Sequence, residues 1–170
     1  SYVANKNNIV QDQAQANAVL PSVEPLFLKQ GFTETSSSGP FDDYLSIGVG
    51  KTPMVMIYES QFVSRAAAND GSIGKDMVLI YPSPTLLSKH TLVPLKPAGD
   101  QVGRLLQSDS TLQRLEIKYG FRTPNAAQFK QFASSHNVNL PDSLVNVIDP
   151  PTYEVQEYMI SAIEKKIGGQ

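Results

Sequence analysis

A tyrosine, a glutamate and a serine stand side by side as Tyr58, Glu59 and Ser60, between an apolar run and a predicted helix. The run has the length and composition of a buried strand. In open α/β sheets, ligands gather at the carboxyl ends of strands. A tyrosine hydroxyl there can donate a hydrogen bond to an oxyanion, while Glu59 and Ser60 open the following helix. The pattern predicts a polar-ligand site, and a half-buried tyrosine with ordinary helix capping explains it equally well.

Three consecutive serines, Ser36, Ser37 and Ser38, precede Gly39 and Pro40, where a short helix is predicted to begin. Hydroxyl groups and free N–H groups at a helix N-terminus form a cradle for an anion or another polar ligand. A flexible loop in which one serine caps the helix is the alternative. The serines join Tyr58, Glu59 and Ser60 as our predicted ligand-binding residues.

Other motifs do not predict chemistry. Gly50-Lys51-Thr52 invites a phosphate-loop interpretation, but Leu45 stands where that motif needs a glycine, and a proline and an apolar run follow where it needs a helix. Asp42 and Asp43 are adjacent, so on a helix their carboxylates diverge; they suit the first turns of a helix, where negative charge is stabilising.

Catalysis, metals and cofactors are not expected. His90 and His136 are the only histidines, and neither has a second metal ligand or a carboxylate one helical turn away. The chain has no cysteine, which excludes thiol catalysis and cysteine–zinc sites. We therefore predict a protein that is not an enzyme and that needs no cofactor.

The composition of the 170-residue chain fits one ordinary globular domain. Its hydrophobic fraction is 41% and its formal net charge is −2, without the basic patch expected of a nucleic-acid binder. No apolar run approaches the ~18 residues of a membrane span. Residues 1–4 have the composition of a helix interior, so we expect an upstream part of the fold.

Predicted strands alternate with predicted helices, so the expected fold class is α/β. The strands are short apolar runs at residues 53–58, 77–82 and 91–95. Residues 2–10 are weakly helical. Helices are expected at residues 11–20, 22–30, 40–48, 59–69, 98–107, 110–119, 125–135 and 153–167.

The order of these motifs resembles the second half of type II periplasmic solute-binding proteins, including the molybdate-like and phosphate-like groups. The resemblance covers roughly residues 20–125 and rests on short motifs: PMVMIYESQF, DMVLIYPSP, SKHTLVPLK and KYGFR. In particular, Tyr81-Pro82 and Tyr119-Gly120-Phe121-Arg122 match the strand and the turn of the returning lobe. Tyr58, with Glu59 and Ser60, matches a strand end at which such proteins present a tyrosine to the ligand.

The resemblance implies a partial mixed sheet flanked by helices, with residues 1–77 completing the second lobe and residues 78–170 returning to the first. It implies capture of a small polar solute such as an oxyanion, with a hinge near residues 72–78. The expected place is periplasmic, cell-surface or extracellular. The expected partners are the solute and the membrane complex of an ABC-type transporter. No nucleic acid is expected, and a homo-oligomer remains open.

Two other interpretations remain open. The first is a non-catalytic interaction or sensor domain, which needs no ligand pocket near Tyr58 and Ser36–Ser38. The second is a small α/β hydrolase, which needs a nucleophile and a base that converge. The two histidines do not offer such a pair.

Overall fold

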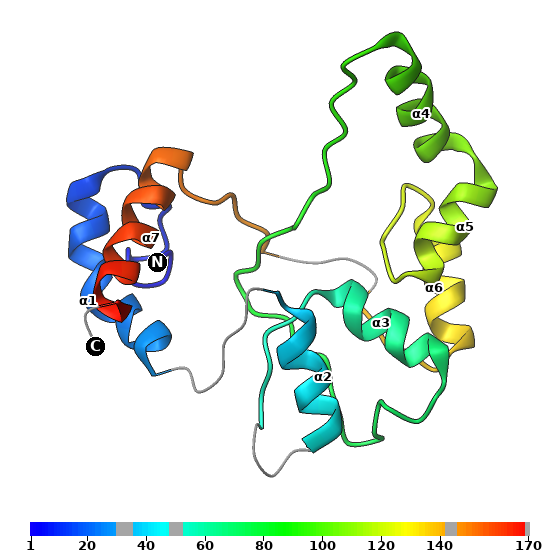
Figure 1. Cartoon of the computed structure of the whole chain (residues 1–170), viewed down its shortest axis with the longest axis horizontal. Coiled ribbons are helices and arrows are strands. Elements are labelled where there is room, and N and C mark those ends of the chain that lie inside the picture. The colour runs from blue at the N-terminus through cyan, green and yellow to red at the C-terminus, as the bar shows by residue number, and fades with distance from the viewer. Residues whose placement is uncertain (30–35, 48–52, 142–145, 169–170) are drawn as a thin grey trace. The chain divides into compact units, whose positions relative to one another are not determined.

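The computed structural model describes residues 1–29, 36–47, 53–141 and 146–168, and over these residues the chain forms seven helices and no strand (Figure 1). The helices differ in length from 9 to 16 residues. Their bounds are α1 Gln13–Leu28, α2 Ser38–Ile47, α3 Glu59–Ala68, α4 Pro97–Ser108, α5 Ser110–Lys118, α6 Ala126–Ser135 and α7 Tyr153–Ile167.

The prediction of an α/β fold with a mixed sheet of the periplasmic-binding-protein type is therefore wrong. Residues 53–58, 77–82 and 91–95 lie outside the helices and form no ladder with any described segment. A single parallel bridge, between Thr85 and Val147, is the β-type contact of the described chain. Runs of apolar and β-branched residues have a local preference for extended backbone. A strand also needs a neighbouring backbone that satisfies its N–H and C=O groups.

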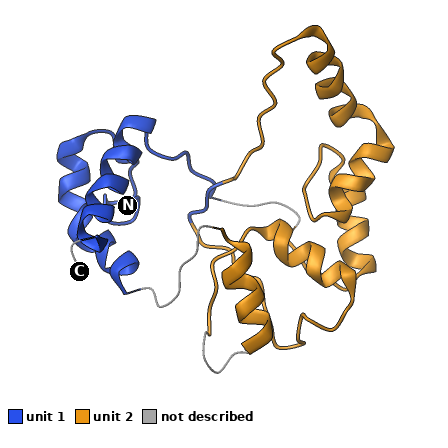
Figure 2. Cartoon of the chain, in the orientation of Figure 1, with its two compact units in different colours: residues 1–33, 84–86, 146–170 blue, residues 34–83, 87–145 orange. Residues whose placement is uncertain are grey.

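The chain divides into two compact units (Figure 2). Unit 1 consists of residues 1–33, 84–86 and 146–170, and unit 2 consists of residues 34–83 and 87–145. The sequence analysis predicted a different division, into residues 1–77 and residues 78–170 as parts of two lobes. Nothing in the structure tests that division, and it stays a prediction.

Unit 1 is built on the packing of α1 against α7. Its core is apolar and draws on both helices. The buried members are Val10, Ala16, Val19, Leu20, Val155, Met159 and Ile163. At the edge of this core, the buried carboxylate of Glu24 pairs with Lys166. Tyr158 donates a hydrogen bond to Asn17 at 2.7 Å. The two ends of the chain are thus joined by both apolar and polar contacts.

Helix α1 is continuous, whereas the sequence predicted two helices separated at Pro21. Asp12 caps it as expected, because its Oδ1 accepts a hydrogen bond from the Gln15 N–H at 2.8 Å. Pro21 and Pro25 both lie inside the helix, where each removes one backbone donor. The buried face that α1 presents to α7 offsets that loss. Residues 2–10, predicted as weakly helical, form turns.

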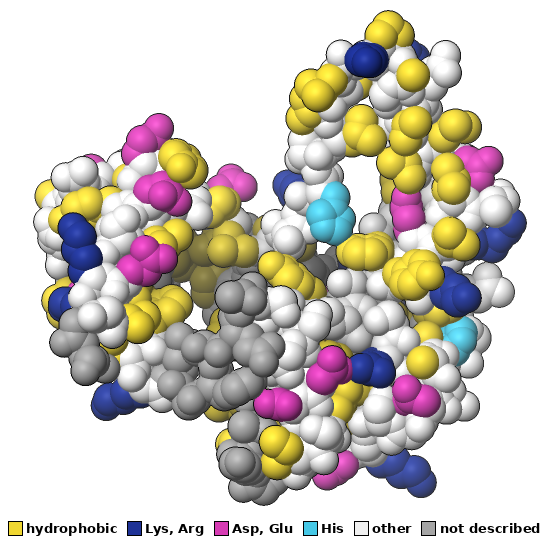
Figure 3. Space-filling model, in the orientation of Figure 1, with side chains coloured by type: hydrophobic (Ala, Val, Ile, Leu, Met, Phe, Trp, Pro, Cys, Tyr) yellow, Lys and Arg dark blue, Asp and Glu magenta, His cyan; other side chains and the backbone are white. Residues whose placement is uncertain are grey.

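Unit 2 has its own core, formed where α3, α5 and α6 meet. Its buried residues are Val63, Ile117, Phe129, Ala133 and Val138. Helix α4 buries no residue, although it carries Val102 and Leu105 at about half exposure. Hydrophobic side chains therefore stay at the surface over this part of the molecule (Figure 3).

We expect the core position on α5 to matter much more for stability than its exposed neighbour. Ile117 is 1% exposed and Leu115 is 53% exposed on the same helix. Ile117→Ala should lower the free energy of unfolding by roughly 2–5 kcal/mol, because it leaves a cavity in a packed core. Leu115→Ala should change it by less than about 0.5 kcal/mol. Urea denaturation of both variants measures the difference, and equal losses would mean that Ile117 is not a core residue.

Candidate functional site

The predicted residues Tyr58, Glu59 and Ser60 lie where an extended segment enters α3. Tyr58 has extended backbone angles and is the N-cap residue of the helix. Its N–H donates to the side chain of Gln61 at 2.9 Å, and the Gln61 N–H donates to the Tyr58 carbonyl at 3.1 Å. This reciprocal pair fixes the start of α3. The Tyr58 residue remains 56% exposed.

Glu59 is the centre of a polar network. Arg122 binds it with two hydrogen bonds, from Nε to Oε1 at 2.7 Å and from Nη2 to Oε2 at 3.0 Å. The Tyr81 hydroxyl donates to the same carboxylate. The side chains of Glu59 and Arg122 are 18% and 32% exposed, so this is a partly buried, fork-shaped pair. The network joins three segments that are far apart in the sequence.

The Tyr81 hydroxyl is held in its protonated form. Burial is the main cause that raises the pKa of Tyr81 far above its usual value, and the hydrogen bond to the Glu59 carboxylate adds to it. The pKa of Arg122 is also raised, first by its hydrogen bond with Glu59. The tyrosine therefore acts as a donor to Glu59, and the guanidinium stays charged.

Gly120 lets the turn after α5 approach the start of α3. Its φ of +85° is in the left-handed region, which favours glycine. A Cβ atom at this position would lie 2.2 Å from the backbone oxygen of Ser60 and 2.8 Å from its Cα. Only glycine fits this approach, and the approach places Arg122 two residues further on beside Glu59.

Arg122 also faces a recess beside α6. Its guanidinium lies 5.0 Å from the centre of the Phe129 ring, and its Nη2 donates to the Pro141 carbonyl at 3.2 Å. The recess has a volume of about 630 Å³ and is lined by Arg122, Thr123, residues of α6 and residues 138–141. The Thr123 hydroxyl is buried without a hydrogen-bond partner. None of the predicted ligand-binding residues lines this recess.

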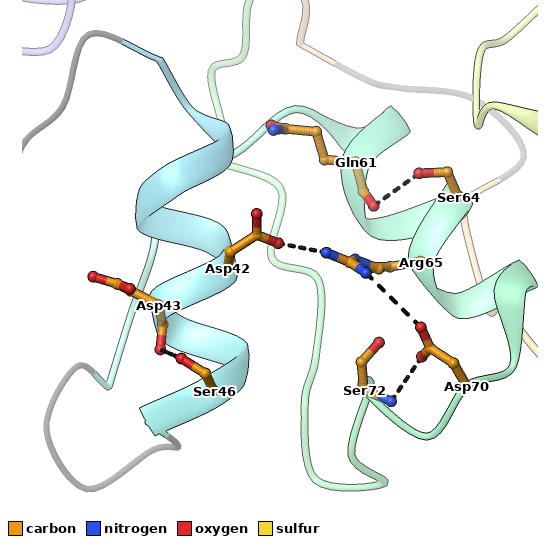
Figure 4. Close-up of polar contacts among 8 residues, drawn as sticks. All are labelled: Asp42, Asp43, Ser46, Gln61, Ser64, Arg65, Asp70 and Ser72. Atoms are coloured by element: carbon orange, nitrogen blue, oxygen red, sulfur yellow. Dashed lines mark hydrogen bonds and ion pairs between the residues drawn. The ribbon is translucent and has the colours of Figure 1, made fainter.

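The serine loop lies at the start of α2. Ser38 is the first residue of that helix, and Ser36 and Ser37 precede it. Among the described residues, no hydrogen bond joins these serines to Tyr58, Glu59 or Ser60. Further along α2, Asp42 forms an ion pair with Arg65 of α3, as Figure 4 shows. Arg65 also lies 3.8 Å from the Asp70 carboxylate.

The described part of the chain holds no cluster of metal-ligating side chains. There, no three His, Asp or Glu side chains converge on a metal position. The His136 ring lies 2.9 Å from the Phe132 carbonyl of its own helix, and His90 packs edge-on against Phe121. The described helices also include none with the length and hydropathy of a membrane span.

Two central residues of this network, Tyr81 and Arg122, were not among the predicted ligand-binding residues. Both stood in motifs that carried the resemblance, Tyr81-Pro82 and Tyr119-Gly120-Phe121-Arg122. The one signal in the sequence was Glu59, a carboxylate at the start of a predicted helix. If such a carboxylate becomes partly buried, it needs a cationic partner. The sequence does not say which of the 14 Lys and Arg residues supplies it.

Comparisons with protein-family models, with curated proteins and with solved structures found no match to this chain.

We predict that the folded protein loses stability in alkali, because the Tyr81 hydroxyl must then lose its proton. Because the pKa of Tyr81 is raised in the folded state, its contribution is complete below the usual tyrosine pKa of about 10 and is lost as the pH rises above that value. The free energy of unfolding should therefore fall from about pH 10 upward, and it should fall less steeply in Tyr81→Phe. Tyr119→Phe is the matched control, because Tyr119 is 60% exposed. Identical pH profiles for wild type and Tyr81→Phe would contradict this assignment.

Proposed function

We propose that this chain is a non-catalytic binding protein that captures a small polar solute, with an oxyanion as the favoured class. The observation that carries the proposal is made at the start of α3. There the hydroxyl groups of Tyr58 and Ser60 flank Glu59 in the sequence, and Arg122 neutralises the Glu59 carboxylate. Tyr58 is largely exposed, and Ser60 follows it in the first turn of the helix. Among the described residues, the Ser60 hydroxyl has no hydrogen-bond partner.

The neutralised carboxylate is important because a free Glu59 would repel an anion. Arg122 occupies both of its oxygens, and Tyr81 donates to one of them. The positive end of the α3 dipole and the hydroxyls of Tyr58 and Ser60 are therefore left without a competing negative charge from Glu59. Neutral donors of this kind replace the water shell of a bound solute without altering it.

The serines at the start of α2 supply a second set of donors. Ser36 and Ser38 are exposed and Ser37 is half-buried. Among the described residues, their hydroxyls make no hydrogen bond. The ion pair between Asp42 and Arg65 links their helix to α3. We assign these serines to the same solute as contributing donors.

In this proposal the chain works outside the cytoplasm, in the periplasm or at the cell surface, and delivers its solute to a membrane transporter of the ABC type. Its role is reversible binding, so it needs neither a cofactor nor a nucleophile.

A second candidate, a non-catalytic interaction domain, is favoured by a different observation. Large apolar side chains of unit 2 are strongly exposed, among them Met54 at 82%, Met56 at 95% and Leu95 at 90%. Apolar side chains that are exposed to this degree favour a surface that a protein partner covers.

The binding proposal predicts selective loss of affinity. Native mass spectrometry and calorimetry with sulfate, phosphate, molybdate, simple sugars and amino acids should identify a ligand of the wild-type chain. Tyr58→Phe and Ser60→Ala should each weaken its binding roughly 3- to 10-fold, the effect of one lost hydrogen bond. Ser38→Ala should act in the same direction.

Ser64→Ala is the matched control for these variants. The Ser64 hydroxyl donates to the Gln61 carbonyl within α3, so its removal should leave the affinity unchanged. Thr123→Val tests the recess beside α6 as the alternative place. If Thr123→Val weakens binding while Tyr58→Phe and Ser60→Ala do not, the solute binds in the recess. If no compound of the panel binds, solute capture by this chain is refuted.

A further inference from the structure

Sulfur occurs in this protein only in the side chains of methionine. The sequence has no cysteine and no tryptophan, so neither a thiol nor an indole competes with these thioethers for an oxidant. The methionines are Met54, Met56, Met77 and Met159. A thioether sulfur is polarisable, and a hydroperoxide converts it to a sulfoxide. The order in which the methionines react therefore depends on how far the fold exposes each sulfur.

Met54 and Met56 form an exposed methionine pair in the segment that leads to α3. They are 82% and 95% exposed, while Val55 between them is half-buried. Successive side chains of an extended segment point to opposite sides, so both methionines lie on the side that faces solvent. The pair is at least this exposed in unit 2 wherever unit 1 lies, because a second unit can cover a side chain but cannot uncover it.

The other two methionines are shielded in different ways. Met159 is 8% exposed and belongs to the core that α1 and α7 form in unit 1. A sulfur in such a core reacts only when local unfolding opens it. Met77 is half-buried, and its sulfur accepts a hydrogen bond from the Gly74 N–H at 3.4 Å. That bond engages a lone pair of the sulfur, and the reaction with a peroxide needs a lone pair.

The fold tolerates oxidation at the pair. A sulfoxide is polar, so in a core it replaces apolar packing with a buried acceptor. Neither Met54 nor Met56 belongs to the core of unit 1 or to the core of unit 2. On these exposed side chains, solvent hydrates the new oxygen. Oxidation of the pair should therefore leave the helices and both cores as they are.

We propose that the exposed methionine pair is a reversible oxidation site whose substrate is a hydroperoxide. With hydrogen peroxide, the sulfur attacks one oxygen, an S–O bond forms and the O–O bond breaks. The other oxygen leaves as water after it takes the proton of the transferred oxygen. Each sulfur loses two electrons and the peroxide gains them. A thiol-dependent sulfoxide reductase reverses the step, since the oxygen then leaves as water and two thiols become a disulfide.

Peroxide treatment of the whole chain, in buffer and in guanidinium chloride, tests the site. Peptide mass spectrometry follows the addition of one oxygen at each methionine. The denatured chain gives the intrinsic rate of each. In the folded chain, Met54 and Met56 should react within about twofold of their intrinsic rates, whereas Met159 should be slowed about tenfold or more and Met77 by a smaller factor. If Met54 and Met56 are slowed as much as Met159, the proposal is overturned.

Leucine variants test the assignment, because leucine is close to methionine in volume and has no sulfur. Met54→Leu combined with Met56→Leu should remove the fast uptake of oxygen, and Met77→Leu is the matched control that should keep it. A chain oxidised only at the pair should retain its circular dichroism and its denaturation midpoint, and the reductase should restore both thioethers. Fast uptake that survives the double substitution would overturn the proposal, and so would unfolding when the pair alone is oxidised.

Discussion

The Glu59 carboxylate holds together three segments on which the arrangement of unit 2 depends. It begins α3, it accepts the hydroxyl hydrogen bond of Tyr81, and it takes both donors of the Arg122 fork. The segment around Tyr81 lies outside the described helices, and its hydroxyl binds the Glu59 carboxylate. The turn that carries Arg122 reaches this place because Gly120 allows its backbone to lie against Ser60. A partly buried carboxylate must be paired, so the network is a structural requirement first.

The same requirement is compatible with the solute binding that we propose. With its charge cancelled, Glu59 no longer opposes an anion, and the start of α3 presents Tyr58 and Ser60 as neutral donors. A ligand role for the hydroxyls and a structural role for the carboxylate are therefore compatible. The sequence analysis grouped Tyr58, Glu59 and Ser60 as one site. In this account Glu59 has the structural role, and Tyr58 and Ser60 have the proposed ligand role.

The sequence predicted best the elements whose signals are local. Helix α7 has the bounds expected from its apolar spacing, and α3, α5 and α6 were placed within about two residues by caps and glycines. It failed for the strands, because pairing depends on a neighbouring backbone that no local pattern reveals. Helix α1 runs through Pro21 because packing against α7 outweighs the local break. Arg122 could not be assigned to Glu59, because 63 positions separate the partners.

The most direct measurement is a double-mutant cycle between Glu59 and Arg122. Urea denaturation of wild type, Glu59→Gln, Arg122→Met and the double variant gives the coupling free energy of the pair. If the network organises unit 2, the coupling should be about 1–3 kcal/mol, because either single change leaves a partly buried charge without its partner. A coupling below about 0.3 kcal/mol would show that the two side chains act independently, and the network would lose its central place.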